Sequence, residues 1–289
     1  MDCRSRVGTV LSVLVALSAC SDRVAVELPD DVQRRAERAT PVPPVPSDPT
    51  NSVADVAAAA HFGRWLFFDK RLSGPGTFSC ASCHDPSLAF SDGKPLGEAI
   101  AVGSRHTPSL LNVAHHRWLG WDGRSDSIWA QALRPMEHPA EMGGDRNAIA
   151  SLIQRDDLLR EAYESIFGEI PDVLNEDTVM RVMANLGKAL AAYQRTLLSG
   201  DAPFDRFMAG TGELSTAAQR GMALFFGEAE CWECHAGPLF TDNEFHNIGI
   251  PPRGGGLPRD EGRFVGSAIV RDDPFNAAGA FSDAPKGTW

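Results

Sequence analysis

Two motifs of the same form, Cys-x-x-Cys-His, constrain this chain of 289 residues more than any other feature of its sequence. The first is Cys80–His84 and the second is Cys231–His235. Two thiols at this spacing can bond the two vinyl groups on one edge of a porphyrin, and the imidazole that follows can ligate its iron. The pattern therefore predicts two covalent c-type haems, with thioether bonds from Cys80, Cys83, Cys231 and Cys234 and iron ligands His84 and His235.

Three other uses of a Cys-x-x-Cys pair are open when one pair is considered alone: a disulfide, a redox dithiol or half of a zinc site. A thioredoxin-type dithiol is expected in a βαβ setting, which this sequence lacks. Zinc needs four ligands in one cluster, and these two pairs are far apart in the chain. Two copies, each followed directly by His, favour haem attachment.

An internal repeat surrounds the two motifs. Residues 63–69 (GRWLFFD) precede the first motif and Phe90-Ser91-Asp92 follows it, whereas residues 221–227 (GMALFFG) precede the second and Phe240-Thr241-Asp242 follows it. Such a repeat predicts two related units. Apolar periodicity predicts helices over 53–68, 146–167, 176–198 and 215–226, and no strand-rich stretch competes. The expected fold is mainly α, with two cytochrome c-like domains that have long irregular loops, each built around one covalent haem.

The first twenty residues are typical of a secretory signal. Arg4 and Arg6 precede an apolar run, and the run ends in Leu17-Ser18-Ala19-Cys20, which is typical of a lipoprotein cleavage site. We therefore expect export to the periplasm and a lipid anchor at Cys20, and Ser21 after it favours the outer membrane. The alternative is a plain signal peptide in which Cys20 is incidental.

The predicted domain organisation follows from these features. Residues 1–20 are the lipoprotein-type signal, 21–50 a Pro-rich tether, 51–200 the N-terminal haem domain and 201–289 an incomplete C-terminal haem domain. The Pro-rich part of the tether is expected to be an extended spacer. The formal net charge of −11 argues against a nucleic-acid partner, because such binding requires clustered Lys and Arg.

The sequence around the first motif resembles the bacterial di-haem cytochrome c peroxidases and their MauG-like relatives. The resemblance covers roughly residues 55–289. It rests on four stretches in a fixed order: CASCHDPSLAFSDG at 80–93, RHTPSLLN at 105–112, WDGR at 121–124 and QALRPMEHPAEM at 131–142.

The resemblance implies a role for each haem and for four further side chains. The haem held by His84 is implied to be peroxidatic, and the haem held by His235 is implied to receive electrons. Glu141 corresponds to the acid–base group over the first haem, and Gln131 to its hydrogen-bonding partner. Pro135 corresponds to a pocket-lining proline and Trp121 to an electron relay between the haems. Without the resemblance, these four would be interpreted as a solvated loop carboxylate, an exposed helix residue, a loop breaker and a core tryptophan.

Three departures from the family pattern change what is expected. Glu98 stands where many members place a removable His over the first haem, so the first iron is expected to be five-coordinate and open. His106 stands where the family often has an Asn calcium ligand, which puts the calcium between the haems in doubt. No Met follows His235, so the usual sixth ligand of the second haem is missing and the chain is expected to be incomplete. The remaining candidates, His115, His116, His138 and His246, are expected to be surface or packing residues.

The predicted function is the reduction of hydrogen peroxide to water with electrons from a small c-type cytochrome or a cupredoxin. One alternative is a MauG-like haem oxidase that modifies a partner protein. Another is a non-catalytic di-haem electron carrier, which would need no acid–base group such as Glu141 over its haem.

Overall fold

The computed structural model describes residues 26–287 apart from 252–253, 255 and 257–259, so the signal segment and Cys20 lie outside the described residues. The described chain is mainly helical, with isolated β-bridges in place of sheets, which confirms the predicted fold class. Its α-helices are α1 (Asp30–Glu37), α2 (Ala57–Phe68), α3 (Cys80–Cys83), α4 (Ile128–Glu137), α5 (Arg146–Arg155), α6 (Asp157–Phe167), α7 (Glu176–Gln194), α8 (Pro203–Met208), α9 (Thr216–Phe226) and α10 (Arg263–Asp272). None of them is long and apolar enough to cross a membrane.

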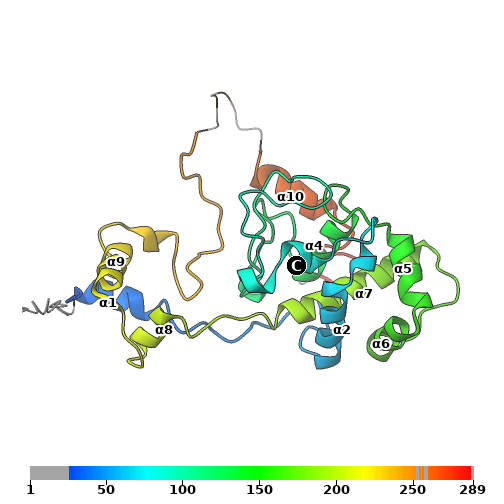
Figure 1. The fold of residues 1–289 in the computed structure, drawn as a ribbon, viewed down its shortest axis with the longest axis horizontal. Coiled ribbons are helices and arrows are strands. Elements are labelled where there is room, and N and C mark those ends of the chain that lie inside the picture. The colour runs from blue at the N-terminus through cyan, green and yellow to red at the C-terminus, as the bar shows by residue number, and fades with distance from the viewer. Residues whose placement is uncertain (1–25, 252–253, 255, 257–259, 288–289) are drawn as a thin grey trace, which may run out of the picture.

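The larger hydrophobic core surrounds α7, against which α2, α4 and α5 pack (Figure 1). Helix α7 is buried along most of its length because its apolar stripe is flanked by small residues such as Ala189 and Ala191. It begins at Asn175, whose side chain accepts a hydrogen bond from the Thr178 amide. The single helix predicted over 146–167 is two helices, because Asp156 is extended and caps the start of α6.

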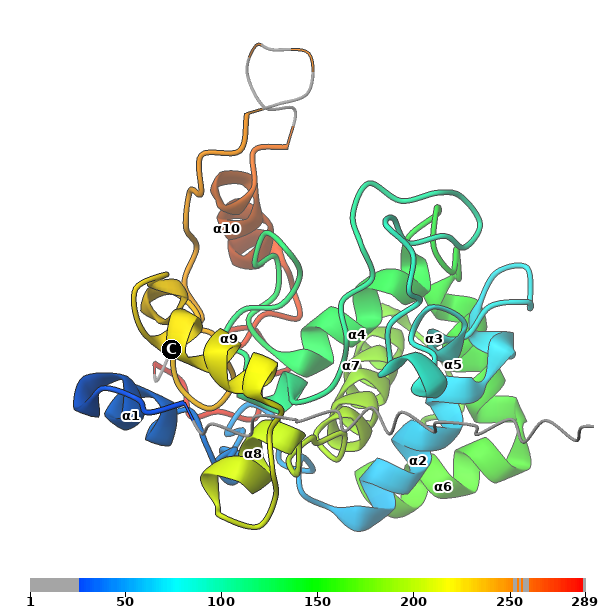
Figure 2. The ribbon, with the colours of Figure 1, turned by 60° about the vertical axis from the view of Figure 1, so that its left-hand side comes forward.

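A second, smaller core is formed by α9 with α8 and α1. Its buried side chains are Val32, Ala36, Ala39, Met222 and Phe226. Helix α1 therefore lies within the segment that the sequence predicts to be a tether, and its apolar face packs on α9. The guanidinium of Arg35 donates to the carbonyl of Phe226 and lies 4.3 Å from the centroid of the Trp232 ring. Both views show α1 beside α9 and remote from α5 and α6 (Figures 1 and 2).

The residues that follow α10 return to the larger core. Phe275 is buried against Trp129 of α4. The amide of Ala277 donates to the carboxylate of Asp126. The ammonium of Lys188, a buried residue of α7, pairs with Asp283 at 2.7 Å. Each end of the described chain thus packs on the unit that is distant from it in sequence. The N-terminal helix packs beside the second motif, and the C-terminal segment packs on the core beside the first.

We predict that Asp283→Ala destabilises the protein by about 3 kcal/mol, because it leaves the Lys188 ammonium buried without its partner. Burial would raise the pKa of Asp283, but hydrogen bonds from Lys188 and Ser52 outweigh it and hold the pKa below its usual value. This part of the stability is therefore present above the pKa of an unfolded Asp and is lost as the pH falls through the lower, folded pKa. Urea unfolding at several pH values measures both effects.

Asp272→Ala is the control, because its pair with Arg271 is exposed and should contribute little. The double variant Lys188→Met/Asp283→Ala should recover most of the loss, since no charge is then left buried. Equal losses for Asp283→Ala and Asp272→Ala would contradict the prediction.

Candidate functional site

The first Cys-x-x-Cys-His motif forms a single helical turn followed by a ligand-ready histidine. The thiols belong to α3, which begins after Ser79, and the Ser79 amide donates to the Ser82 hydroxyl at 3.0 Å. His84 follows at once, and its Nδ1 donates to the carbonyl of Phe90 at 2.9 Å. Because that bond occupies Nδ1, Nε2 is the nitrogen that can bind an iron. Burial lowers the pKa of His84, so the ring is neutral at neutral pH, as a metal ligand requires.

The second motif repeats this geometry. His235 donates from Nδ1 to the carbonyl of Phe240 at 3.0 Å. Phe90 and Phe240 both adopt left-handed backbone conformations, with φ of 58° and 53°. This explains the repeated Phe-Ser/Thr-Asp sequence, because in each unit it forms the turn that aims a carbonyl at the histidine ring.

The four cysteines of the two motifs are free thiols. Burial raises the pKa of Cys80 to about 12 and also raises that of Cys83. A raised pKa disfavours the thiolate that a redox dithiol or a zinc ligand needs. Within the described part of the chain, no three His, Cys, Asp or Glu side chains gather where they could hold a metal ion. The raised pKa values therefore disfavour the zinc and redox interpretations for the first pair.

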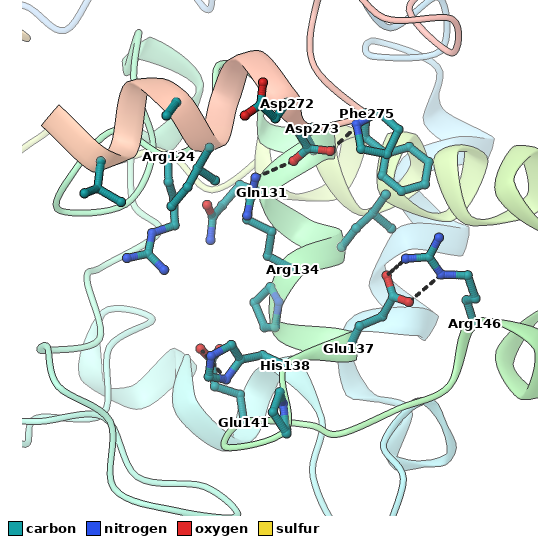
Figure 3. Close-up of a pocket in the computed structure, with 18 residues that line it drawn as sticks. Arg124, Gln131, Arg134, Glu137, His138, Glu141, Arg146, Asp272, Asp273 and Phe275 are labelled. Atoms are coloured by element: carbon teal, nitrogen blue, oxygen red, sulfur yellow. Dashed lines mark hydrogen bonds and ion pairs between the residues drawn. The ribbon is translucent and has the colours of Figure 1, made fainter. Parts of the chain in front are cut away.

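A cavity of about 670 Å³ lies between α4, the turn at residues 138–141, and α10 with the residues that follow it (Figure 3). Three of the four side chains predicted to be catalytic line this cavity: Gln131, Pro135 and Glu141. Gln131 and Pro135 are one turn apart on α4, and Glu141 lies on the turn that follows the helix. The side chain of His138 lies beside Glu141, with Nδ1 3.5 Å from a carboxylate oxygen.

The cavity lies next to the first motif. The amide of Ala101 donates to the carbonyl of Ala140 at 2.9 Å, so the segment 98–101 runs along the turn that carries Glu141. The Cys83 thiol approaches the carbonyl of Glu98 in the same segment at 3.8 Å. The pKa of Cys83 is raised first by burial and further by the charges of Asp92 and Glu141. The Glu141 carboxylate is therefore close enough to the thiol to affect its pKa.

Gln131 has a feature of a ligand-binding group. Its side-chain oxygen is buried and has no hydrogen-bond partner among the residues that the structure describes. A buried polar atom without a partner costs stability and often marks a binding site. Pro135 also affects the hydrogen bonding of this helix face. It lacks the amide hydrogen that would bond to the Gln131 carbonyl within α4.

The family model for di-haem cytochrome c peroxidase matches residues 57–213 of this chain, more than half of its length. The chain belongs to the di-haem cytochrome c peroxidase family. It is 39% identical over 199 residues to the methylamine utilization protein MauG of Methylophilus methylotrophus, covering 67% of this chain and 57% of that protein. It is 37% identical over 218 residues to the cytochrome-c peroxidase IdrP1 of Denitromonas iodatirespirans, covering 73% and 53% of the two chains.

Solved structures agree. The di-haem peroxidase BthA from Burkholderia thailandensis matches 79% of this chain and 65% of its own, with a TM-score of 0.66 and 29% identity. The chain spans about half the length of the curated relatives it matches.

This membership of the di-haem peroxidase family implies two c-type haems, and the residues of both motifs fit them. Each motif offers two free thiols and a histidine whose Nδ1 is already occupied by a carbonyl. The partnerless oxygen of Gln131 adds a polar group beside the first of the two sites.

Several other residues named from the sequence do not line the cavity. Trp121 does not line the cavity and is not a core residue, because it is 59% exposed; its Nε1 donates to the carbonyl of His106 at 2.8 Å. Glu98 forms an exposed ion pair with Lys94. His116 approaches Asn243 at 3.3 Å, and His246 pairs with Asp242 at 2.7 Å.

Sequence reasoning missed several groups that line the cavity. His138 was expected at the surface or in packing, and although half-exposed it lines the cavity beside Glu141. Its position three residues before Glu141 was the available signal. Arg134, three residues after Gln131, had a similar signal. The wall formed by Val265 and Ile269 of α10 had none, because only tertiary folding brings it to the cavity.

We predict that replacing the thiols of one motif removes one haem and leaves the other. In protein matured in a host with c-type cytochrome assembly, Cys80→Ala/Cys83→Ala and Cys231→Ala/Cys234→Ala should each retain one covalent haem, because each motif is complete in itself. Intact mass after denaturation counts the attached haems. Glu233→Ala, at a variable position of the second motif, should keep both. A double-cysteine variant that still carries two haems would contradict the assignment.

Proposed function

We propose that this protein is a di-haem c-type peroxidase that reduces hydrogen peroxide to water with electrons from a small c-type cytochrome or a cupredoxin. One observation carries the proposal. Four carboxylates line the cavity, and three of them are paired with arginine: Glu137 with Arg146, Asp272 with Arg271, and Asp273 with Arg134. Glu141 has no arginine partner among the described residues; its neighbour is His138.

This difference matters for proton transfer. The oxygens of the three paired carboxylates already accept bonds from a guanidinium, so they are less free to contact a bound peroxide. A half-exposed carboxylate beside an imidazole can accept a proton and return it. Glu141 is therefore the side chain in this cavity that is suited to acid–base work.

The roles of the chain's own residues follow. Cys80, Cys83 and His84 would hold the first haem, and Cys231, Cys234 and His235 the second. The haem irons supply the binding of peroxide and the transfer of electrons. Glu141 would take the proton from one peroxide oxygen and give it to the oxygen that leaves. Gln131 would accept a hydrogen bond through its partnerless oxygen and so orient the bound molecule. Overall, one peroxide, two electrons and two protons give two waters.

A second candidate is a MauG-like oxidase that modifies a partner protein. It is favoured by the relatives named MauG, which are 39% and 40% identical, and by Glu98 in place of a histidine over the first site. Sustained peroxide-dependent oxidation of a reduced small cytochrome c supports the peroxidase. A spectral response to peroxide without such turnover supports the oxidase, and no response supports an electron carrier.

The cellular location is part of the proposal. Residues 1–20 support export to the periplasm, and Cys20 supports a lipid anchor in the outer membrane. Labelling of cells with a radioactive fatty acid should mark the wild-type protein and not Cys20→Ser.

We predict that Glu141→Gln keeps both haems and slows the reaction with peroxide by at least about 100-fold, because the amide cannot shuttle the proton. Stopped-flow mixing with peroxide, read from the optical spectrum of the first haem, measures this rate, and intact mass confirms the haem content. Glu161→Gln on α6, which does not line the cavity, is the matched control and should react normally. A near-normal rate for Glu141→Gln would remove this residue from the mechanism.

A further inference from the structure

A charged cluster joins the loop that carries Trp121 to the segment after the second motif. Arg105 lies at its centre. Its guanidinium contacts Asp122 at 2.9 Å and holds Asp260 through two bonds of 2.6 and 2.8 Å. Asp122 is 2% exposed, so Arg105 connects a buried carboxylate next to Trp121 with a carboxylate far along the chain.

The charges in this cluster are balanced and permanent. Two guanidinium groups contact Asp122. Arg124 donates to it from Nε and Nη2, and Arg105 contacts it as well. Burial would raise the pKa of Asp122, but the bonds from Arg124 and Arg105 outweigh it and bring the pKa to about 2. The carboxylate is therefore ionised throughout the neutral range, and the contact does not depend on pH there.

Helix α10 presses on the same loop. Arg263, at its first position, donates to the carbonyl of Gly123 at 2.5 Å, and its guanidinium lies 3.9 Å from the centroid of the Trp118 ring. Gly266 approaches so closely that a Cβ there would be 2.0 Å from the carbonyl oxygen of Asp122. The loop at residues 118–124 is thus held by α10 at its backbone and by Arg105 at its buried carboxylate.

The stretch that carries Arg105 also orients Trp121 and is bound to the first unit. The carbonyl of His106 accepts the indole Nε1–H of Trp121 at 2.8 Å. The carbonyl of Thr107 accepts the Ser91 hydroxyl at 2.8 Å, and Ser91 follows the residue whose carbonyl orients His84. Hydrogen bonds, joined by the backbone at 90–91 and 105–107, therefore connect the first motif with Trp121, Asp122 and Asp260.

We propose that Arg105 is a positioning residue that fixes the Trp121 loop against the segment 260–266 and thereby controls the passage of electrons between the two haem sites. The inference rests on the proposed function and on the roles that the resemblance implies, in which electrons enter at the second haem, pass Trp121 and are used at the first. Arg105 itself touches neither motif in the described contacts. It acts through Asp122 and Asp260, by keeping the indole of Trp121 in one place.

The alternative is that Arg105 forms an ordinary surface ion pair, which would contribute almost nothing. The chain offers a matched control for this alternative. Arg71 also bridges two carboxylates, Asp69 at 2.6 Å and Asp156 at 2.7 Å, but it is more exposed and lies away from Trp121. Arg71→Gln removes a bridging guanidinium of the same kind without affecting the loop.

The experiment compares Arg105→Gln, Arg105→Lys and Arg71→Gln in full-length protein that carries both haems. Protein with its second haem reduced is mixed with peroxide, and the spectra of the two haems are followed separately. Hydrogen exchange of peptides from 118–124 and 260–266 is measured on the same samples. In Arg105→Gln we expect the second haem to be oxidised roughly tenfold more slowly, because the rate depends on the position of a group that the loop no longer holds in one place. The response of the first haem should be unchanged, and both peptides should exchange faster.

The two other variants sharpen the result. Arg71→Gln should match the wild type in every measurement. Arg105→Lys should fall between, because an ammonium cannot reproduce the two-bonded contact with Asp260 while also reaching Asp122. If the second haem of Arg105→Gln is oxidised at the wild-type rate, the inference is overturned, even if hydrogen exchange of the two peptides is faster. Arg105 would then have a structural role only. A wild-type protein inert to peroxide would instead defeat the proposed function, and unchanged exchange in Arg105→Gln would still defeat the positioning role.

Discussion

The hydrogen bond from a histidine ring to a backbone carbonyl is the interaction on which both halves of this molecule depend. In each unit it runs from Nδ1 to a phenylalanine carbonyl, at 2.9 Å for His84 and 3.0 Å for His235. It selects the tautomer and the ring orientation that present Nε2 to an iron. The carbonyl can point at the ring only because Phe90 and Phe240 adopt positive φ, which is uncommon for a bulky residue. The strained backbone of these two turns therefore orients the histidine rings.

The two units support this shared geometry with very different amounts of core. The first motif packs on the large core around α7, and Cys80 and Ala81 contact it directly. The second relies on the small core of α9, in which Val32 and Ala36 come from the opposite end of the chain. A core with few buried side chains is marginal unless other segments add to it. Helix α1 makes that addition, and Arg35 extends it to Trp232 within the second motif.

The sequence predicted those features that depend on local pattern. Helices α7 and α9 follow from apolar periodicity, and the structure caps them at Asn175 and Ser215. Local pattern could not reveal that Asp156 divides the helix expected over 146–167, since an aspartate is acceptable both within a helix and as its cap. Helices α1 and α10 were not expected, because each is short and is stabilised by residues distant in the sequence. The exposure of Trp121 was likewise beyond reach, because it depends on how the loop is held by Arg105 and α10.

The candidate site was more predictable than the fold around it, and α4 shows why. Gln131, Arg134, Pro135 and the following His138 recur at spacings of three and four residues, which places them on one face of a helix. Trp129, Leu133 and Met136 occupy the opposite face and are buried in the large core. A helix anchored by one face holds the side chains of its other face rigidly, which is what a reacting group requires. Gln131, Pro135 and Glu141 were named through the family resemblance, and the helix of α4 explains why they line one cavity, whereas the opposite wall, from α10, depends on the tertiary fold.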